Sequence, residues 1–214
     1  MHIPDGLLPA QVCVGGYGIA GGITWFVLRQ IRRTASSSED LPKAAMLTAA
    51  FFVGSSINLP LPPASVHLVL NGLLGALLGW YAWPAILVGL LLQALLLGHG
   101  GLTTLGVDAV MIGGPSLVAY GVYQLRHSVR GLLKESWRFG LFSFLAGATG
   151  LGLSAIIFFS LILLTLPADL DIASEEQALS LLLIAHIPLM FIEGGVTTMT
   201  ALFLRRIKPE LINS

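Results

Sequence analysis

Residues 44–107 read AAMLTAAFFVGSSINLPLPPASVHLVLNGLLGALLGWYAWPAILVGLLLQALLLGHGGLTTLGV, and these 64 residues contain no Asp, Glu, Lys or Arg. A helix crosses the hydrocarbon core of a bilayer with about 20 apolar residues. The run therefore predicts three crossings and the turns between them. The prolines around Pro62 cannot continue a helix, and the aromatic cluster before Pro84 is typical of a membrane interface. The run predicts a protein that crosses the membrane several times.

The composition of the whole chain agrees with this prediction. The 214 residues are 55% hydrophobic and only 10% charged, with 11 Lys and Arg against 11 Asp and Glu. Soluble domains carry about 25% charged residues, so an ordinary water-soluble enzyme and a disordered protein are excluded. A net charge of zero also excludes a nucleic-acid-binding protein. The single cysteine, Cys13, cannot form an internal disulfide.

We predict one all-α integral membrane domain over residues 1–214, because charge-free runs recur along the chain. Residues 1–9 form an N-terminal segment that we expect to insert into the bundle. Seven transmembrane helices follow, at about 10–29, 43–59, 65–82, 84–98, 103–125, 138–166 and 178–204.

The positive residues predict the orientation. With seven crossings, all eleven Lys and Arg fall on one side of the membrane, which is the cytoplasmic side by the positive-inside rule. The C-terminus is then cytoplasmic, and the N-terminus lies outside with the acidic residues of loop 169–176. No Lys or Arg precedes Arg29, so a cleavable signal is not expected and Met1 should be the mature terminus.

The sequence Met1-His2-Ile3-Pro4-Asp5-Gly6 is suited to metal chelation. The Met1 amine and the His2 backbone nitrogen close a five-membered ring on a metal ion. The same backbone nitrogen and His2 Nδ1 close a six-membered ring. Three nitrogens in one plane suit Ni(II) or Cu(II), with Co(II) also reachable. The turn-forming Asp5-Gly6 pair lets the segment fold back on the bundle.

A fourth ligand must come from the same side of the membrane as His2. His67, at the outer end of the third predicted helix, meets this condition, and His99 competes with it. The alternative is that His67 is a buried histidine whose hydrogen bonds a neighbour satisfies. His127 lies among cytoplasmic arginines and is interpreted as a solvated loop residue.

Three further ionisable residues fall inside predicted helices: Asp108, His186 and Glu193. Intramembrane ionisable residues are candidates for function because their burial is costly. We prefer to interpret all three as hydrogen-bond partners between helices. The chain has no phosphate-binding loop, zinc-protease motif or hydrolase motif, so we expect a non-enzymatic protein that does not itself bind ATP through such a loop.

Four segments together resemble the CbiM/NikM family, the substrate-capture (S) subunits of cobalt and nickel energy-coupling factor transporters. The matching segments are 1–6, 65–68, 98–108 and 186–194, and the resemblance covers essentially the whole chain.

The resemblance implies a seven-helix protein that binds one Ni(II) or Co(II) as the transported substrate, with no organic cofactor. The implied ligands are the Met1 amine, the His2 backbone nitrogen and imidazole, and the His67 imidazole. His99 then has a role at the entrance or beside the ligands. The residues expected to support the ligands are Asp5, Ser65, His99, Asp108, His186 and Glu193. The family usually has Asn near the position of Asp108.

The resemblance also implies partners and a location. These are a transmembrane coupling (T) subunit and two cytoplasmic ATPases, in the plasma membrane of a prokaryote. The imported metal would supply nickel enzymes or cobalamin biosynthesis. Ala45 and Ala49, one helical turn apart, are candidates for the face that meets the coupling subunit. The alternative for this pair is packing inside the bundle.

Three other functions stay open at this point. The first is an S subunit for a vitamin. The second is an intramembrane enzyme that uses His186 with Ser154, or Glu193 with Asp108. The third is a passive channel.

Overall fold

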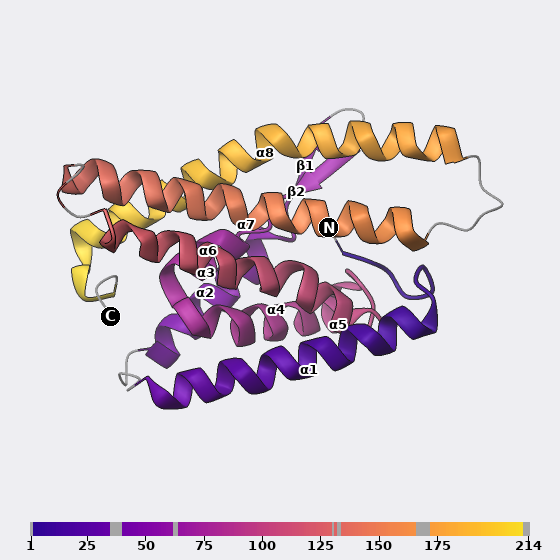
Figure 1. Ribbon diagram of the computed structural model, residues 1–214, viewed down its shortest axis with the longest axis horizontal. Coiled ribbons are helices and arrows are strands. Elements are labelled where there is room, and N and C mark those ends of the chain that lie inside the picture. The colour runs from indigo at the N-terminus through magenta and orange to yellow at the C-terminus, as the bar shows by residue number, and fades with distance from the viewer. Residues whose placement is uncertain are drawn as a thin grey trace.

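The structure is a computed structural model that describes residues 2–34, 40–61, 64–129, 131, 134–165 and 172–211. It is a helical bundle with one short β-hairpin (Figure 1). The helices are α1 (Ala10–Arg33), α2 (Asp40–Gly54), α3 (Asn71–Leu78), α4 (Ala82–Leu97), α5 (Leu105–Asp108), α6 (Gly114–Gln124), α7 (Glu135–Thr165) and α8 (Ile172–Ile207). The hairpin strands are β1 (Asn58–Leu61) and β2 (Ala64–His67), and short 3₁₀ or π turns cover Gly79–Tyr81, Ala109–Gly113, Leu125–His127 and Pro209–Leu211.

Within the described residues, five helical stretches are long and apolar enough to cross a membrane: 10–33, 71–97, 105–127, 135–165 and 183–207. Helix α2 is apolar but shorter. The prediction of a helical membrane protein is therefore confirmed, whereas the count of seven crossings and the orientation stay predictions.

The predicted third crossing, 65–82, is wrong at its start, because β2 occupies residues 64–67 and the helix begins only at Asn71. The second crossing likewise ends at Gly54 rather than at residue 59. Residues Asn58 and His67 face each other in the antiparallel hairpin that lies between the two helices. Pro60 lies in β1. Proline cannot continue a helix because it lacks the backbone N–H. Absence of charge alone could not separate an apolar hairpin from a helix.

Helix α3 lies at the centre of the molecule, and all eight of its residues are buried. It packs against α6, α7 and α8. Gly72 of α3 and Gly150 of α7 permit a close approach, since a Cβ on either would collide with the opposing backbone. Gly79 has φ +57°, so the helical stretch 71–97 is interrupted where α3 ends and α4 follows.

Polar side chains of α4 bind to α1 and to the end of α2. Trp83 of α4 donates a hydrogen bond from Nε1 to Thr24 Oγ1 of α1 at 2.9 Å. Gln93 of α4 donates to Ser55, just after α2, at 2.6 Å. Figure 1 shows α1 along one side of the bundle and α7 with α8 along the other, while the N-terminal segment turns back from the start of α1 towards the middle.

Candidate metal centre

Three histidines from distant parts of the chain come together near the N-terminus. The rings of His2 and His67 are stacked, with centroids 5.0 Å apart and planes inclined by 2°. His99 also stacks with His2, with centroids 6.3 Å apart and planes inclined by 15°. The two residues proposed as imidazole ligands and their competitor are therefore neighbours.

Several ring nitrogens of these histidines make no hydrogen bond to the described residues. Both ring nitrogens of His2, and Nδ1 of His99, are buried and have no hydrogen-bond partner among the described residues. His67 Nδ1 lies 3.3 Å from the Leu68 carbonyl oxygen. When Nδ1 of His67 carries the proton and donates this bond, Nε2 is the nitrogen that can bind a metal.

Burial favours the neutral form of the His2 and His67 rings. It lowers the pKa of His2 to about 2 and that of His67 to about 3, and the positive charge of the N-terminus adds to both effects. A neutral imidazole has the lone pair that a metal ligand needs. Both imidazoles therefore keep this lone pair at neutral pH.

Ile3 anchors the N-terminal segment next to His2. Its N–H donates to the two carboxylate oxygens of Asp108, at 3.2 and 3.4 Å. Its carbonyl oxygen accepts a bond of 2.5 Å from the hydroxyl of Thr104. The Ile3 side chain is fully buried. Ile3 is thus held through its N–H, its carbonyl oxygen and its buried side chain.

Asp5 binds the two residues that precede Thr104 in the sequence. Its Oδ1 accepts bonds from the N–H and the hydroxyl of Thr103, at 2.8 and 2.5 Å, and its Oδ2 accepts the N–H of Leu102 at 3.3 Å. The hydroxyl bond from Thr103 is the largest cause that lowers the pKa of Asp5. Residue 101 must be glycine here, because a Cβ would fall on the Asp5 carboxylate.

Glu193 positions the backbone that follows His67. This fully buried residue of α8 accepts the N–H of Val69, and that of Leu70 at 3.0 and 3.1 Å. Leu70 has φ +55°, a backbone conformation that is uncommon for a residue other than glycine. The carboxylate therefore holds the connection between β2 and α3 in place.

The other predicted residues have varied surroundings. His186 is buried on α8, where its ring meets that of Phe159 edge-on at 5.6 Å. Ser65 pairs with Pro60 in the hairpin. Met1 lies outside the described residues. His127 is exposed, as predicted.

The described residues include no group of three or more His, Cys, Asp or Glu side chains placed to hold a metal ion. A metal at the stacked pair would thus need ligands besides side chains. The backbone nitrogen of His2 is such a donor by its chemistry, and the terminal amine is another.

Ser154, Asp108 and Glu193, three of the four residues considered for an intramembrane enzyme, each accept a hydrogen bond from another part of the chain. Ser154 accepts a bond of 2.8 Å from Asn71 Nδ2. Asp108 and Glu193 accept backbone N–H groups from two different segments. This arrangement agrees with the interpretation that these carboxylates serve as hydrogen-bond partners, although the partners are backbone groups of loops rather than neighbouring helices.

Thr103 and Thr104 were not among the predicted site residues, yet both bind the N-terminal segment. The available signal was the run Gly100–Thr104, in which two glycines precede two hydroxyl side chains next to Asp108. Such a run offers N–H and hydroxyl donors to a carboxylate.

Comparison with known proteins gives a consistent result. The profile of the CbiM family, described as "Cobalt uptake substrate-specific transmembrane region", matches residues 2–211. A putative metal transport protein of Haemophilus influenzae is 32% identical, over 100% of this chain and 97% of that protein. A putative cobalt transport protein of Methanosphaerula palustris is 32% identical, over 99% and 90%. The fused nickel transport protein NikMN of Rhodobacter capsulatus is 32% identical, over 99% of this chain and 64% of that longer protein.

Two crystal structures have a similar fold. A transition metal transporter superposes with a TM-score of 0.76 at 23% identity, over 97% of this chain and 93% of that chain. A truncated transition metal transporter superposes with a TM-score of 0.75 at 24% identity, over 96% and 99%.

Proposed function

The chain belongs to the CbiM family of cobalt and nickel transport proteins, and from this premise we propose that it captures one Ni(II) or Co(II) ion for import. The proposed ligands are the Met1 amine, the His2 backbone nitrogen, His2 Nδ1 and the imidazole of His67. The observation that carries the proposal is the partly buried, parallel pair of His2 and His67, with ring centroids 5.0 Å apart. Neither ring nitrogen of His2 has a hydrogen-bond partner among the described residues.

The surroundings of the pair support this role. Asp108, Thr104 and Asp5 hold the N-terminal segment at the centre, while Glu193 holds the backbone after His67. Groups that orient ligands in this way raise metal affinity because the site is formed before the ion arrives. His99 stacks beside His2 and is proposed to receive the ion on its way to the ligands.

The protein is proposed to work as the S subunit of an energy-coupling factor transporter in the plasma membrane of a prokaryote. A transmembrane coupling subunit and two cytoplasmic ATPases would supply the energy, since this chain has no phosphate-binding loop. Ala45 and Ala49 are both exposed on α2, whereas Ala44 is buried. This exposure favours an outward contact of the pair over packing inside the bundle.

The direct test is elemental analysis of protein purified with its native N-terminus after loading with Ni(II) or Co(II). We expect one metal ion per chain after excess metal is removed. A vitamin-binding subunit, a hydrolase of the kind considered above or a passive channel would retain no stoichiometric transition metal, and such a result would refute the proposal.

A further inference from the structure

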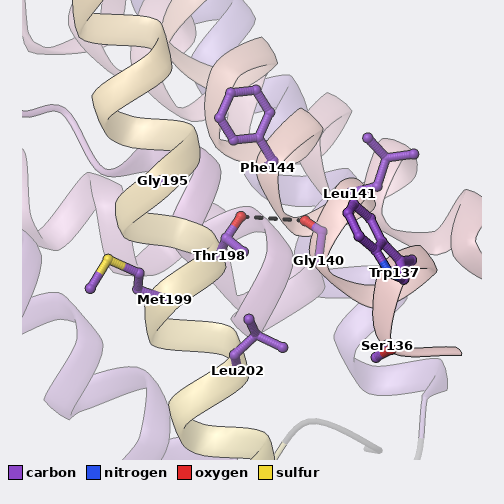
Figure 2. Close-up of a pocket in the computed structure, with 9 residues that line it drawn as sticks. All are labelled: Ser136, Trp137, Gly140, Leu141, Phe144, Gly195, Thr198, Met199 and Leu202. Carbon is purple, nitrogen blue, oxygen red and sulfur yellow. Dashed lines mark hydrogen bonds between the residues drawn. The ribbon is translucent and has the colours of Figure 1, made fainter.

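An apolar groove of about 540 Å³ lies between α7 and α8 (Figure 2). Trp137 and Leu141 line it on α7, and Met199 and Leu202 line it on α8. Two of these side chains are strongly exposed, at 75% for Trp137 and 74% for Met199. The groove therefore opens on the outer surface of the bundle.

Glycines keep the groove open. A Cβ on Gly195 would have no other atom within 4 Å, and one on Gly140 would meet only the methyl group of Thr198, at 3.8 Å. The Thr198 hydroxyl lies 2.8 Å from the Gly194 carbonyl oxygen of α8 and 3.3 Å from the Gly140 carbonyl oxygen of α7, at the floor of the groove (Figure 2). The space is thus a property of the helix pair, and the packing of α7 on α8 does not use it.

Positive charge gathers at one end of the groove. The ends of α7 and α8 meet there, and residues 134–138 and 205–210 contain five Lys or Arg against two Glu. One of the acids, Glu135, forms an ion pair with Arg205, whose guanidinium also lies 4.8 Å from the Phe139 ring centre. The remaining excess of cations is available to an anionic ligand.

Two of these cations continue the faces that line the groove. Lys134, Trp137 and Leu141 are spaced by three and four residues, as are Met199, Leu202 and Arg206. Residues at this spacing share a face of a helix. Each wall of the apolar groove is thus followed, about one helical turn further, by an exposed cation.

We propose that this groove binds an anionic phospholipid, with one acyl chain between α7 and α8 and the phosphate group next to Lys134 and Arg206. A phospholipid has an apolar acyl chain, which would lie between the apolar walls. It also has an anionic phosphate, which would lie next to the cations one helical turn beyond them. Exposed tryptophan is typical of the depth at which lipid head groups lie, and Lys and Arg attract anionic lipids there. In this proposal Trp137, which lines the groove, lies at the depth of the head groups.

The site is separate from the proposed metal centre. Glu193, which holds the backbone after His67, is fully buried on α8. Gly195, which lines the groove on the same helix, instead borders open space. Lipid binding and metal binding can therefore be measured independently.

The test uses the full chain, with its native N-terminus, in phosphatidylcholine nanodiscs that contain a rising fraction of phosphatidylglycerol. One of the two lipids carries bromine on its acyl chains, which quenches nearby tryptophan. The signal of Trp137 is the difference between the native protein and Trp137→Phe. We expect brominated phosphatidylglycerol to quench this signal at a several-fold lower mole fraction than brominated phosphatidylcholine, because each cation near the surface contributes about fivefold.

Two variants locate the effect. Arg206→Gln should reduce the preference for phosphatidylglycerol about fivefold. Gly195→Leu fills the groove from a position with open space, so it should remove the preference. Gly21→Leu, which also enters open space but on α1, is the matched control and should leave the preference unchanged. Metal binding reports whether each variant is folded.

Equal quenching by the two lipids would refute the proposal, as would a Gly195→Leu variant that is folded and keeps the preference. If Gly195→Leu fails to bind metal, Arg206→Gln alone decides, because a surface substitution cannot disturb the packing of the helices. If the lipids do not differ and Gly195→Leu instead prevents assembly with the coupling subunit, the groove binds a protein and the lipid proposal is wrong.

Discussion

The two segments that carry His2 and His67 are held in place by different means. The His2 segment is bound on both sides of Ile3, by Asp108 and Thr104, and again at Asp5 by Thr103. The His67 segment is bound by a single carboxylate, from Glu193.

The difference follows from local structure. Residues 2–4 lie outside the helices and strands, so side-chain bonds supply the order that regular backbone pairing would otherwise supply. His67 is the last residue of β2, where it pairs with Asn58 of β1, and α3 begins four residues later. We therefore expect substitutions around the first segment to lower metal affinity, and substitutions around the second to lower the stability of the fold as well.

The largest effect should come from the histidines themselves. His2→Ala and His67→Ala are each expected to abolish stoichiometric metal binding, because each removes an imidazole ligand from the proposed set. His127→Ala, at an exposed position, is the control and should bind one ion per chain. Elemental analysis after removal of excess metal measures the result.

The reverse pattern would change the assignment. If His99→Ala lost binding and His67→Ala retained it, the fourth ligand would be His99, which also stacks on His2.

The next effect concerns the carboxylate that binds Ile3. Asp108→Ala should weaken metal binding about 10- to 100-fold, as is usual when a group that orients a metal ligand is removed. Asp108→Asn retains an acceptor oxygen for the Ile3 N–H and should bind metal more tightly than the alanine variant. Calorimetric titration with Ni(II) gives both affinities. Unchanged affinity in Asp108→Ala would show that Asp108 does not position the His2 segment.

Glu193 should affect the fold more than Asp108 does. Glu193→Ala leaves the buried N–H groups of Val69 and Leu70 without their acceptor, and each unpaired group costs about 1–3 kcal/mol. The free energy of unfolding should therefore be lower in this variant. Glu193→Gln keeps an acceptor, so its free energy of unfolding should decrease less. Thermal unfolding of the metal-free protein in detergent measures the difference. A native unfolding temperature in Glu193→Ala would contradict the proposed role.

The smallest effect on metal binding should come from the exposed face of α2. Ala45→Leu with Ala49→Leu is expected to leave metal binding intact but to prevent assembly with the coupling subunit, because small residues permit close packing of helices. Gly21→Leu, at an exposed position on α1, is the matched control and should assemble. Pull-down of the coupling subunit and metal analysis are carried out on the same samples. Normal assembly of the double variant would place the docking face elsewhere.

Much of the fold could be predicted from the sequence, because an apolar run without charges has few alternatives to a membrane helix. The end of α4 at Leu97, before a left-handed Gly98, agrees with the predicted end at residue 98. The β-hairpin was missed since its residues are as apolar as those of a helix, and only Pro60 and its neighbours indicated a break.

The site was predictable in part for a similar reason. His2, His67 and His99 could be placed on one side of the membrane from the predicted crossings, and the structure brings them together. The partners of Asp108 and Glu193 could not be predicted, because both carboxylates accept N–H groups of the backbone, which every residue carries. Only the tertiary structure decides which N–H lies within reach.

The central claim is that the N-terminal amine binds the metal together with His2 and His67. One extra residue before Met1 tests it most directly, because this change leaves every histidine in place and converts the amine into an amide. Calorimetric titration with Ni(II) or Co(II) should show stoichiometric binding by the native chain and its loss in the extended chain. Equal affinity in the two proteins would contradict the claim.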